Sequence, residues 1–308
     1  MRIASLLASA TEVVCALGAG DMLVGRSHEC DAPAWVTRLP ALSAPTFDIT
    51  GSSLAIDERV RAKLRAGEPL YRIDERLLTE LAPDVVLTQS HCEVCAVSPA
   101  DLAHGATPAA AAGVLREHIL AIQTGTIEGI LTGFLDVARA IDRAREGEEL
   151  VRTCRGRLDA ISAKTRDLPR PTVVCLEWLE PPFAMGNWGP ELVEIAGGTC
   201  LLGRPGEHST TTPWEAVREA DPDVLVVAPC GFGLERTKSE LDVLRAYPGF
   251  HDLRAVREGR AFVADGNSLF NRSGPTVIDT ADLLAELLHP DVFPRRERAA
   301  PTDWELLA

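Results

Sequence analysis

The chain contains two copies of one sequence pattern, and this internal repeat constrains the fold more than any other feature. The first copy reads TEVVCALGAGDMLVG at 11–25, and the second reads PELVEIAGGTCLLG at 190–203. Another matched pair, at 81–87 and 220–226, has the pattern of a helix end, a Pro-Asp turn and a continuous apolar strand. Strands of this kind are typical of parallel sheets, and their alternation with helices predicts βαβ units. Two repeats are too few for a solenoid, so we expect two α/β lobes that face each other.

The segment between the two copies, 126–168, is predicted to be helical almost throughout. Apolar residues recur at helical spacing in its first half, and this helix is expected to end near Gly147. A second helix is expected over 148–166, because Pro169 stops the pattern. A long helix between the lobes would act as a stiff spine.

The length of 308 residues suits two domains better than one small domain. The expected parts are an N-terminal α/β lobe at 1–125, the helical spine at 126–168, a C-terminal α/β lobe at 169–290 and a C-terminal tail at 291–308.

The first residues look like the start of a signal peptide, but their pattern favours a folded segment. Glu12 interrupts the apolar run, and no small-residue cleavage site followed by a polar start is present. We expect a strand over 2–7, a turn at 8–10 and a helix over 11–17 that is closed by Gly18. No apolar run has the length needed to span a bilayer. We therefore expect a cytoplasmic protein without membrane insertion.

The charge balance argues against nucleic acid as a partner. The net charge is −14, and phosphate binding requires a basic face. The one basic cluster, at 295–298, is expected to be part of a solvated tail. The sequence also has no Walker A loop, no G-x-G-x-x-G after a strand, no G-x-S-x-G and no H-E-x-x-H.

The eight cysteines are expected to be reduced thiols rather than a disulfide framework. In open parallel sheets, ligands bind beyond the carboxyl ends of the strands. Four cysteines follow predicted strands and are expected to face the cleft between the lobes: Cys30, Cys92, Cys95 and Cys230. The other four are expected to be thiols of the core: Cys15, Cys154, Cys175 and Cys200.

These four strand-end cysteines suggest a metal centre. The C-x-x-C pair of Cys92 and Cys95 can place two thiolates on one ion, and Cys30 with Cys230 would complete a four-thiolate site for zinc or a [4Fe–4S] cluster. Two alternatives are a redox-active thiol set and cysteines that line the cleft without special chemistry.

Several acidic and histidine residues near these cysteines are candidates for chemistry. His28, His91 and Glu93 could ligate a metal, orient a ligand or transfer protons. The candidate catalytic residues are His28, Glu29, Glu93 and Glu177.

The second lobe adds an aromatic rim. Trp178, Phe183 and Trp188 follow a predicted strand, and exposed indoles beside a cleft suit a flat corrin or porphyrin ring. The alternative is that both indoles pack the loop against its own lobe. The predicted ligand-binding residues are Trp178, Trp188, Asn187, His208, Asn271 and Arg272. For Arg272, the alternative is a surface ion pair of little consequence.

Seven phrases of the sequence resemble the helical-backbone metal receptors among the periplasmic binding proteins. They are RIASLLASATEVVCALG, LVGRSHECD, IDERLLTELAPDVVLTQSHCEVCAVS, VVCLEWLEPPF, PELVEIAGG, DPDVLVVAPCGFG and AVREGRAFVADGN. The resemblance is greatest to members described as cobalamin-binding or as substrate-binding proteins of ABC transporters. It implies a class III fold, with two Rossmann-like lobes joined by a long backbone helix. It also implies cobalamin, haem or a ferric chelate as ligand.

The chain departs from this subgroup at two loops. Asn187 stands where the subgroup has a histidine, and 272–276 reads RSGPT where an RPGPR loop is usual. These departures imply that the ligand differs from the usual one. The resemblance also implies contact of Glu12 and Glu191 with an ABC permease; the alternative is that both carboxylates favour the first turn of a helix.

Two main hypotheses follow. The first is a binding protein that holds a corrinoid, a metal chelate or a metal or iron–sulfur centre in the inter-lobe cleft. The alternative is a cytosolic enzyme on the same fold that uses a cysteine-ligated [4Fe–4S] or other metal centre on a small-molecule substrate. A redox sensor or scaffold is a third hypothesis.

Overall fold

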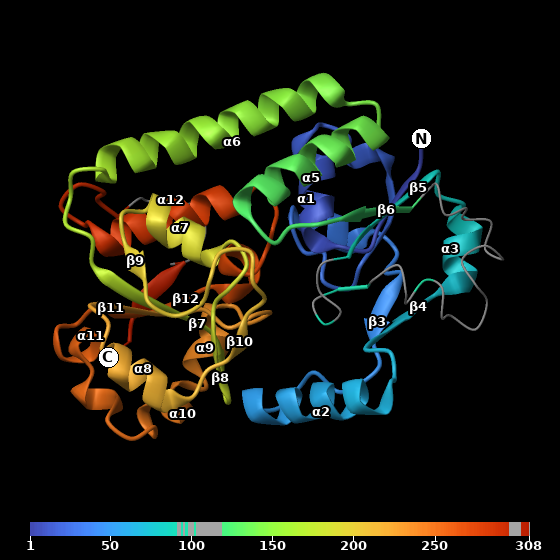
Figure 1. The fold of residues 1–308 in the computed structure, drawn as a ribbon. Helices are drawn as coiled ribbons and strands as arrows, with labels where there is room; N and C mark the ends of the chain where they lie inside the picture. The colour runs from blue at the N-terminus through green and yellow to red at the C-terminus, as the bar shows by residue number, and fades with distance from the viewer. Residues whose placement is uncertain (91–93, 95, 98–101, 103–118, 296–302, 308) are drawn as a thin grey trace. The chain divides into compact units, whose positions relative to one another are not determined.

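The computed structural model describes residues 1–90, 94, 96–97, 102, 119–295 and 303–307. The chain forms two compact units (Figure 1). Unit 1 comprises Met1–Gly51, Glu58–Thr124 and Glu128–Cys154, and unit 2 comprises Ser52–Asp57, Gly125–Ile127 and Arg155–Ala308. The residues expected to form a separate spine are thus divided between the two units.

Unit 1 is built on a parallel sheet with the strand order β2-β1-β5-β6. Its strands are β1 (Ile3–Ser5), β2 (Leu23–Arg26), β5 (Val85–Gln89) and β6 (Ile119–Ile122). β1 is entirely buried because it pairs with both β2 and β5. A separate antiparallel pair joins β3 (Ser43–Pro45) to β4 (Tyr71–Ile73). The first residues of the chain therefore form the centre of the sheet.

The first helix, α1, begins earlier than the sequence pattern predicts. It spans Ala8–Ala16, and Leu7 caps it in an extended conformation, so the expected turn at 8–10 is already helical. Small side chains at these positions permit a direct passage from strand to helix. The other helices that lie wholly or partly in unit 1 are η1 (Gly20–Met22), η2 (Ala34–Arg38), α2 (Ser53–Ala66), α3 (Glu75–Leu81), α5 (Ile127–Ala140) and α6 (Ala144–Thr165).

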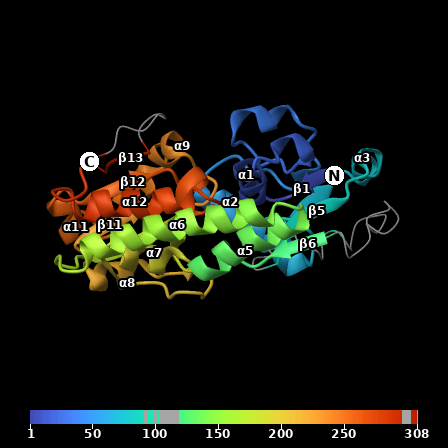
Figure 2. The same ribbon diagram turned by 90° about the horizontal axis from the view of Figure 1, so that it is seen from above.

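The predicted break of the long helical segment is misplaced. α5 and α6 are separated at 141–143, where Asp142 adopts a positive φ of 56°, whereas Gly147 lies inside α6. A Cβ atom at Gly147 would approach the Cβ of Ala138 to 2.4 Å. This glycine therefore allows α6 to pack closely on α5 and does not end a helix. The two helices run side by side in Figure 2.

Unit 2 is built on a larger mixed sheet with the order β10-β8-β7-β11-β12-β13. β7, β11 and β12 are parallel, and their register pairs Val227, the last residue of β11, with Leu176, so β7 continues beyond β11 to Leu179. β9 pairs with the beginning of β7, and β8 pairs with its end. The strands are β7 (Thr172–Leu179), β8 (Pro182–Ala184), β9 (Thr199–Cys200), β10 (Thr210–Thr211), β11 (Val224–Val227), β12 (Ala261–Ala264) and β13 (Trp304–Leu306).

Helices cover both faces of this sheet (Figures 1 and 2). They are α7 (Gly189–Ile195), α8 (Trp214–Ala220), α9 (Leu234–Lys238), α10 (Leu241–Arg245), η4 (Phe250–Asp252), α11 (Arg254–Arg257), η5 (Gly266–Phe270) and α12 (Val277–Leu288). α12 is almost completely buried, and Arg157 of α6 pairs with its Asp279 and Asp282. No helix in the described part of the chain is long and apolar enough to cross a membrane.

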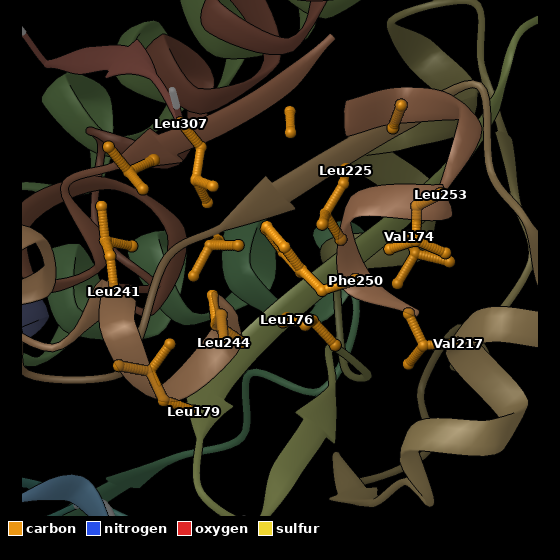
Figure 3. Close-up of a cluster of buried hydrophobic side chains, with 14 of the residues drawn as sticks. Val174, Leu176, Leu179, Val217, Leu225, Leu241, Leu244, Phe250, Leu253 and Leu307 are labelled. Atoms are coloured by element: carbon orange, nitrogen blue, oxygen red, sulfur yellow. The ribbon is translucent and has the colours of Figure 1, made fainter. Parts of the chain in front are cut away.

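The C-terminal segment is not merely a solvated tail. β13 pairs antiparallel with β12 and completes the edge of the sheet. Leu307, directly after it, is 5% exposed and belongs to the core of unit 2. Figure 3 shows this core, in which Leu176, Leu225 and Phe250 pack together. The sequence predicts a solvated tail because of the charged residues at 295–298, and the apolar strand that follows them is too short for its pattern to be recognised.

Candidate ligand-binding loops

The loop after β2 gathers polar side chains around His28. The Oγ atom of Ser43 lies 2.9 Å from Nδ1 of His28, and the backbone N–H of His28 donates to the same oxygen over 3.2 Å. Ser43 in turn donates to the Oγ of Ser27 over 3.2 Å. Both serines are buried, so the imidazole is held by hydroxyl groups to which water has little access.

The environment of His28 favours the neutral imidazole. Burial lowers its pKa from the ordinary value, and the positive charge of Arg26 lowers the pKa further. Nε2 lies 3.9 Å from Oε1 of Glu29, and the ring of Tyr71 packs 5.5 Å from the imidazole centroid. Because the pKa is lowered, the ion pair between His28 and Glu29 forms only when the pH falls below that pKa.

The cysteine in this loop lies inside unit 1. Cys30 is 1% exposed, and its Sγ lies 3.1 Å from Oγ1 of Thr11 on α1. Cys92, Cys95, His91 and Glu93 lie outside the described residues. Among the residues that the structure does describe, no group of three histidine, cysteine or carboxylate side chains is arranged to hold a metal ion. The four-thiolate site therefore stays a prediction.

Three of the four cysteines expected in the core are poor nucleophiles. Burial raises the pKa of Cys15 and of Cys200 to about 11, and it raises the pKa of Cys175 still more strongly. These thiols stay protonated at neutral pH, and the thiolate is the reactive form. Cys154 and Cys175 are buried, whereas Cys15 and Cys200 are half-buried at the edge of the core.

In unit 2, aromatic side chains gather near the end of β7 and after β11. Trp178 lies inside β7 rather than after it, because the strand continues to Leu179 and pairs with β8. The rings of Trp178 and Phe232 lie 5.1 Å apart in a tilted arrangement, and the guanidinium of Arg236 lies 4.4 Å from the Phe232 centroid. Arg236 also pairs with Glu240, so its charge is fixed over the ring. Trp178 is half-buried. This tryptophan, which the sequence predicts as a ligand-binding residue, is thus part of a cluster with Phe232 and Arg236.

The indole N–H of Trp178 is unusual. Nε1 is buried and has no hydrogen-bond acceptor in the described part of the chain. A buried donor without a partner costs about 1–3 kcal/mol. Such a group therefore points to an acceptor supplied by a ligand or by an ordered water.

Backbone contacts fix the loop after β11. Cys230 is exposed, and its N–H donates to the carbonyl of Glu177 over 2.9 Å. The side chain of Asn271 donates to the carbonyls of Ala228 and Gly266, each over 2.9 Å. Asn271 thus joins the loops that follow β11 and β12. The sequence predicts this residue as a ligand-binding residue, and the structure gives its side chain a structural role.

Two residues predicted to bind ligand are more buried than the sequence suggests. Trp188 is 5% exposed and donates its indole N–H to the carbonyl of Phe270, so it packs within unit 2 rather than forming an exposed rim. Arg272 is also 5% exposed and donates to Oδ1 of Asn267. It is therefore not a surface ion pair.

Asn187 and His208 lie in two loops that contact each other. The N–H of Asn187 donates to the carbonyl of Glu207 over 2.6 Å, and Asn187 has a positive φ of 51°. A Cβ at Gly186 would lie only 2.4 Å from the carbonyl oxygen of Glu207, so this close approach requires glycine. The side chain of His208 is exposed beside this contact.

The two glutamates aligned by the repeat have different environments. Glu12 is 8% exposed and lies in the second turn of α1, so its expected place in a first helical turn is wrong. Glu191 does lie in the first turn of α7, and its carboxylate accepts the N–H of Ile127, the first residue of α5, over 2.7 Å. It thus satisfies a donor at the start of another helix.

The sequence reasoning missed several residues of these loops. Ser43 and Tyr71 lie far from His28 in sequence, on β3 and β4, and only the fold brings them to it. Phe232 and Arg236 lie in the segment that follows β11. An aromatic and a basic residue after a predicted strand could have identified them as candidates.

A comparison with family models identifies the family of the chain. The model described as "Periplasmic binding protein" matches residues 3–267, which is most of the chain. The chain belongs to the periplasmic binding protein family. A search of curated proteins found no match.

Solved structures of this family share the fold of the chain. A periplasmic haem-binding protein from Pseudomonas aeruginosa is 20% identical, with a TM-score of 0.68 over 94% of this chain and 92% of that one. The vitamin B12-binding protein BtuF of Vibrio cholerae is 18% identical, with a TM-score of 0.64 over 96% and 98%. A protein of an Fe³⁺-hydroxamate transport system from Saccharomonospora viridis is 22% identical, with a TM-score of 0.64 over 94% and 93%. These likenesses confirm the class III periplasmic-binding-protein architecture that the sequence predicts.

Proposed function

We propose that this periplasmic binding protein holds a metal chelate that carries oxygen acceptors, such as haem, a corrinoid or a ferric hydroxamate. The observation that carries the proposal is the buried indole N–H of Trp178, which has no acceptor among the described residues. Propionate, amide and hydroxamate oxygens are acceptors of the required kind. The rings of Trp178 and Phe232 add apolar surface. Proteins of the same fold that are named for haem, vitamin B12 and Fe³⁺-hydroxamate transport support a ligand of this class.

Replacing Trp178 with Phe tests this role. The variant keeps an aromatic ring but removes the N–H, so we expect the affinity for the cognate chelate to fall about tenfold, or about 1.4 kcal/mol. The stability of the unliganded protein should stay the same or rise, because an unsatisfied buried donor is removed. Titrations with haemin, cobalamin and a ferric hydroxamate, followed by absorption, measure affinity, and urea denaturation measures stability.

Trp188→Phe is the matched control. Trp188 donates its N–H to the carbonyl of Phe270, so this variant should lose stability by about 1 kcal/mol while it binds the chelate normally. Absence of binding by all three chelates, or equal loss of affinity in both variants, would argue against the proposed role of Trp178.

A second function, an enzyme with a cysteine-ligated [4Fe–4S] or other metal centre, has one observation in its favour. Cys230 is exposed directly after β11, at the end of a parallel strand where ligands bind in α/β sheets. If Cys230 ligates such a centre, protein purified without oxygen should be brown and contain iron and sulfide, and Cys230→Ser should remove the colour. Cys200→Ser is the control, because the Cys200 thiol donates to the carbonyl of Leu202 and should not affect the colour. Colourless wild-type protein without metal contradicts this second function.

We propose a cytoplasmic location. The residues that look like the start of a signal peptide include β1, which is the fully buried centre of the sheet of unit 1. Cleavage after these residues would remove that strand. Fractionation of the native cells tests the proposal: protein in the cytoplasmic fraction supports it, and protein in an extracytoplasmic fraction refutes it.

An ABC permease as partner is supported by the fold, which the chain shares with an ABC transporter substrate-binding protein from Listeria monocytogenes EGD-e. Contact through the two glutamates has less support, because Glu12 is only 8% exposed and the carboxylate of Glu191 accepts the N–H of Ile127.

A further inference from the structure

Two serine hydroxyls lie beside one ring nitrogen of His28. Oγ of Ser43 is 2.9 Å from Nδ1, and Oγ of Ser27 is 3.4 Å from the same nitrogen. Protein hydroxyl groups therefore occupy the Nδ1 side of the ring. Nε2 is the nitrogen that can take a ligand, which requires the neutral tautomer with its proton on Nδ1.

Backbone donors hold this arrangement in place. The N–H of His28 donates to Ser43 Oγ over 3.2 Å, and the N–H of Glu29 donates to Ser27 Oγ over 3.3 Å. The exposed fractions of Ser27 and Ser43 are 2% and 5%, which leaves little room for water to reorient the hydroxyls. The ring of Tyr71 packs against the imidazole at 5.5 Å and restricts its rotation.

Nε2 of His28 faces a second metal-ligating group. Oε1 of Glu29 lies 3.9 Å from Nε2, and the two side chains are 20% and 43% exposed. Zinc-like cations bind imidazole nitrogen and carboxylate oxygen at about 2.0–2.2 Å, so a tetrahedral cation requires the two atoms about 3.4 Å apart. A small rotation of the exposed Glu29 side chain closes the difference. Arg26 is the positive group nearby, and its guanidinium is directed to the backbone carbonyls of Ser27 and His28.

We propose that His28 and Glu29 bind a borderline divalent cation such as Zn²⁺ or Co²⁺, with Nε2 of His28 as ligand and Ser43 as the residue that orients the ring through Nδ1. Imidazole nitrogen is a preferred ligand of these cations. A hydrogen-bond partner on the other ring nitrogen is what orients a metal-binding histidine. Two protein ligands leave the remaining coordination positions to water or to donor atoms of a bound molecule.

Cobalt titration tests the cation site directly. Co²⁺ is added to the metal-free full-length protein, and its visible d–d absorption is followed. We expect His28→Ala to abolish the saturable absorption change and Glu29→Gln to weaken binding about tenfold. His251→Ala is the control, because His251 is an exposed histidine of unit 2 that packs on Phe250. Unchanged cobalt binding by His28→Ala overturns the site.

The tautomer is tested without any metal. Long-range ¹H–¹⁵N spectra of protein labelled on histidine should show His28 with its proton on Nδ1. Ser43→Ala should shift the ring toward the other tautomer and weaken cobalt binding about tenfold, and Ser43→Thr should restore both. A wild-type ring protonated on Nε2 overturns the proposal even if a variant fails to fold. The cation site does not depend on chelate binding, which the titrations of the Trp178 variants measure separately.

Discussion

Phe250→Ala is expected to lower the free energy of unfolding of unit 2 by about 3–5 kcal/mol. Phe250 is 1% exposed and lies at the centre of the core in Figure 3, beside Leu176 and Leu225. Its ring stacks at 6.2 Å from the indole of Trp214. Truncation to alanine removes buried apolar surface and leaves a cavity that the surrounding strands and helices fill only in part.

Urea denaturation followed by circular dichroism measures this loss. His251→Ala is the neighbouring control: His251 is exposed and its ring is perpendicular to that of Phe250, so its removal should cost less than about 1 kcal/mol. Equal effects of the two substitutions would mean that this cluster is not the stabilising core of unit 2.

Gly266→Ala is expected to disrupt the loops that follow β11 and β12. A Cβ at this position would lie 2.1 Å from the carbonyl oxygen of Pro229 and 2.6 Å from that of Ala228. Both atoms belong to the backbone and cannot move aside as a flexible side chain would. The N–H of Gly266 also donates to the carbonyl of Phe232 over 3.0 Å, so displacement at Gly266 moves the loop that carries the aromatic cluster.

We expect Gly266→Ala to cost about 1–3 kcal/mol of stability and to weaken chelate binding at least about tenfold. Gly233→Ala is the matched control, because a Cβ there meets no atom within 4 Å. The measurements are urea denaturation and the titrations described for Trp178. Retained chelate binding by a folded Gly266→Ala protein would show that these loops do not hold the ligand.

Much of the fold follows from local patterns in the sequence. The repeat indicates two α/β units because matched strand–helix phrases must bury similar apolar faces. Apolar runs such as 85–87 and 224–227 identify buried parallel strands, and the structure confirms them as β5 and β11. The family follows from the same phrases.

Boundaries were less predictable because they depend on packing. Gly147 is a helix-ending residue by its propensity, yet it lies inside α6 because Ala138 of α5 approaches it. The charged residues at 295–298 predict a solvated tail, yet β13 pairs with β12 because the edge of the sheet is open there. Both outcomes depend on residues that lie elsewhere in the chain.

The candidate site was predictable only in part. The rule that ligands bind beyond parallel strand ends selects the region of His28, Trp178 and Cys230, and the structure places these residues after β2, near the end of β7 and after β11. It could not distinguish Trp178, whose N–H is unsatisfied, from Trp188, whose N–H donates to Phe270. The two tryptophans differ in backbone neighbours, which no local pattern encodes.

The sequence by itself determined the two-unit α/β architecture and the family, because periodicity and repeated phrases are local properties of the chain. The tertiary structure decided what each polar side chain does, because hydrogen-bond partners come from distant segments. Ser43 reaches His28 only because the segment that contains β3 returns beside the loop after β2, and Glu191 reaches Ile127 only because α5 begins next to α7. The internal repeat thus indicates where the candidate ligand-binding loops lie. Packing between distant segments of the chain decides which side chains in these loops can contact a ligand.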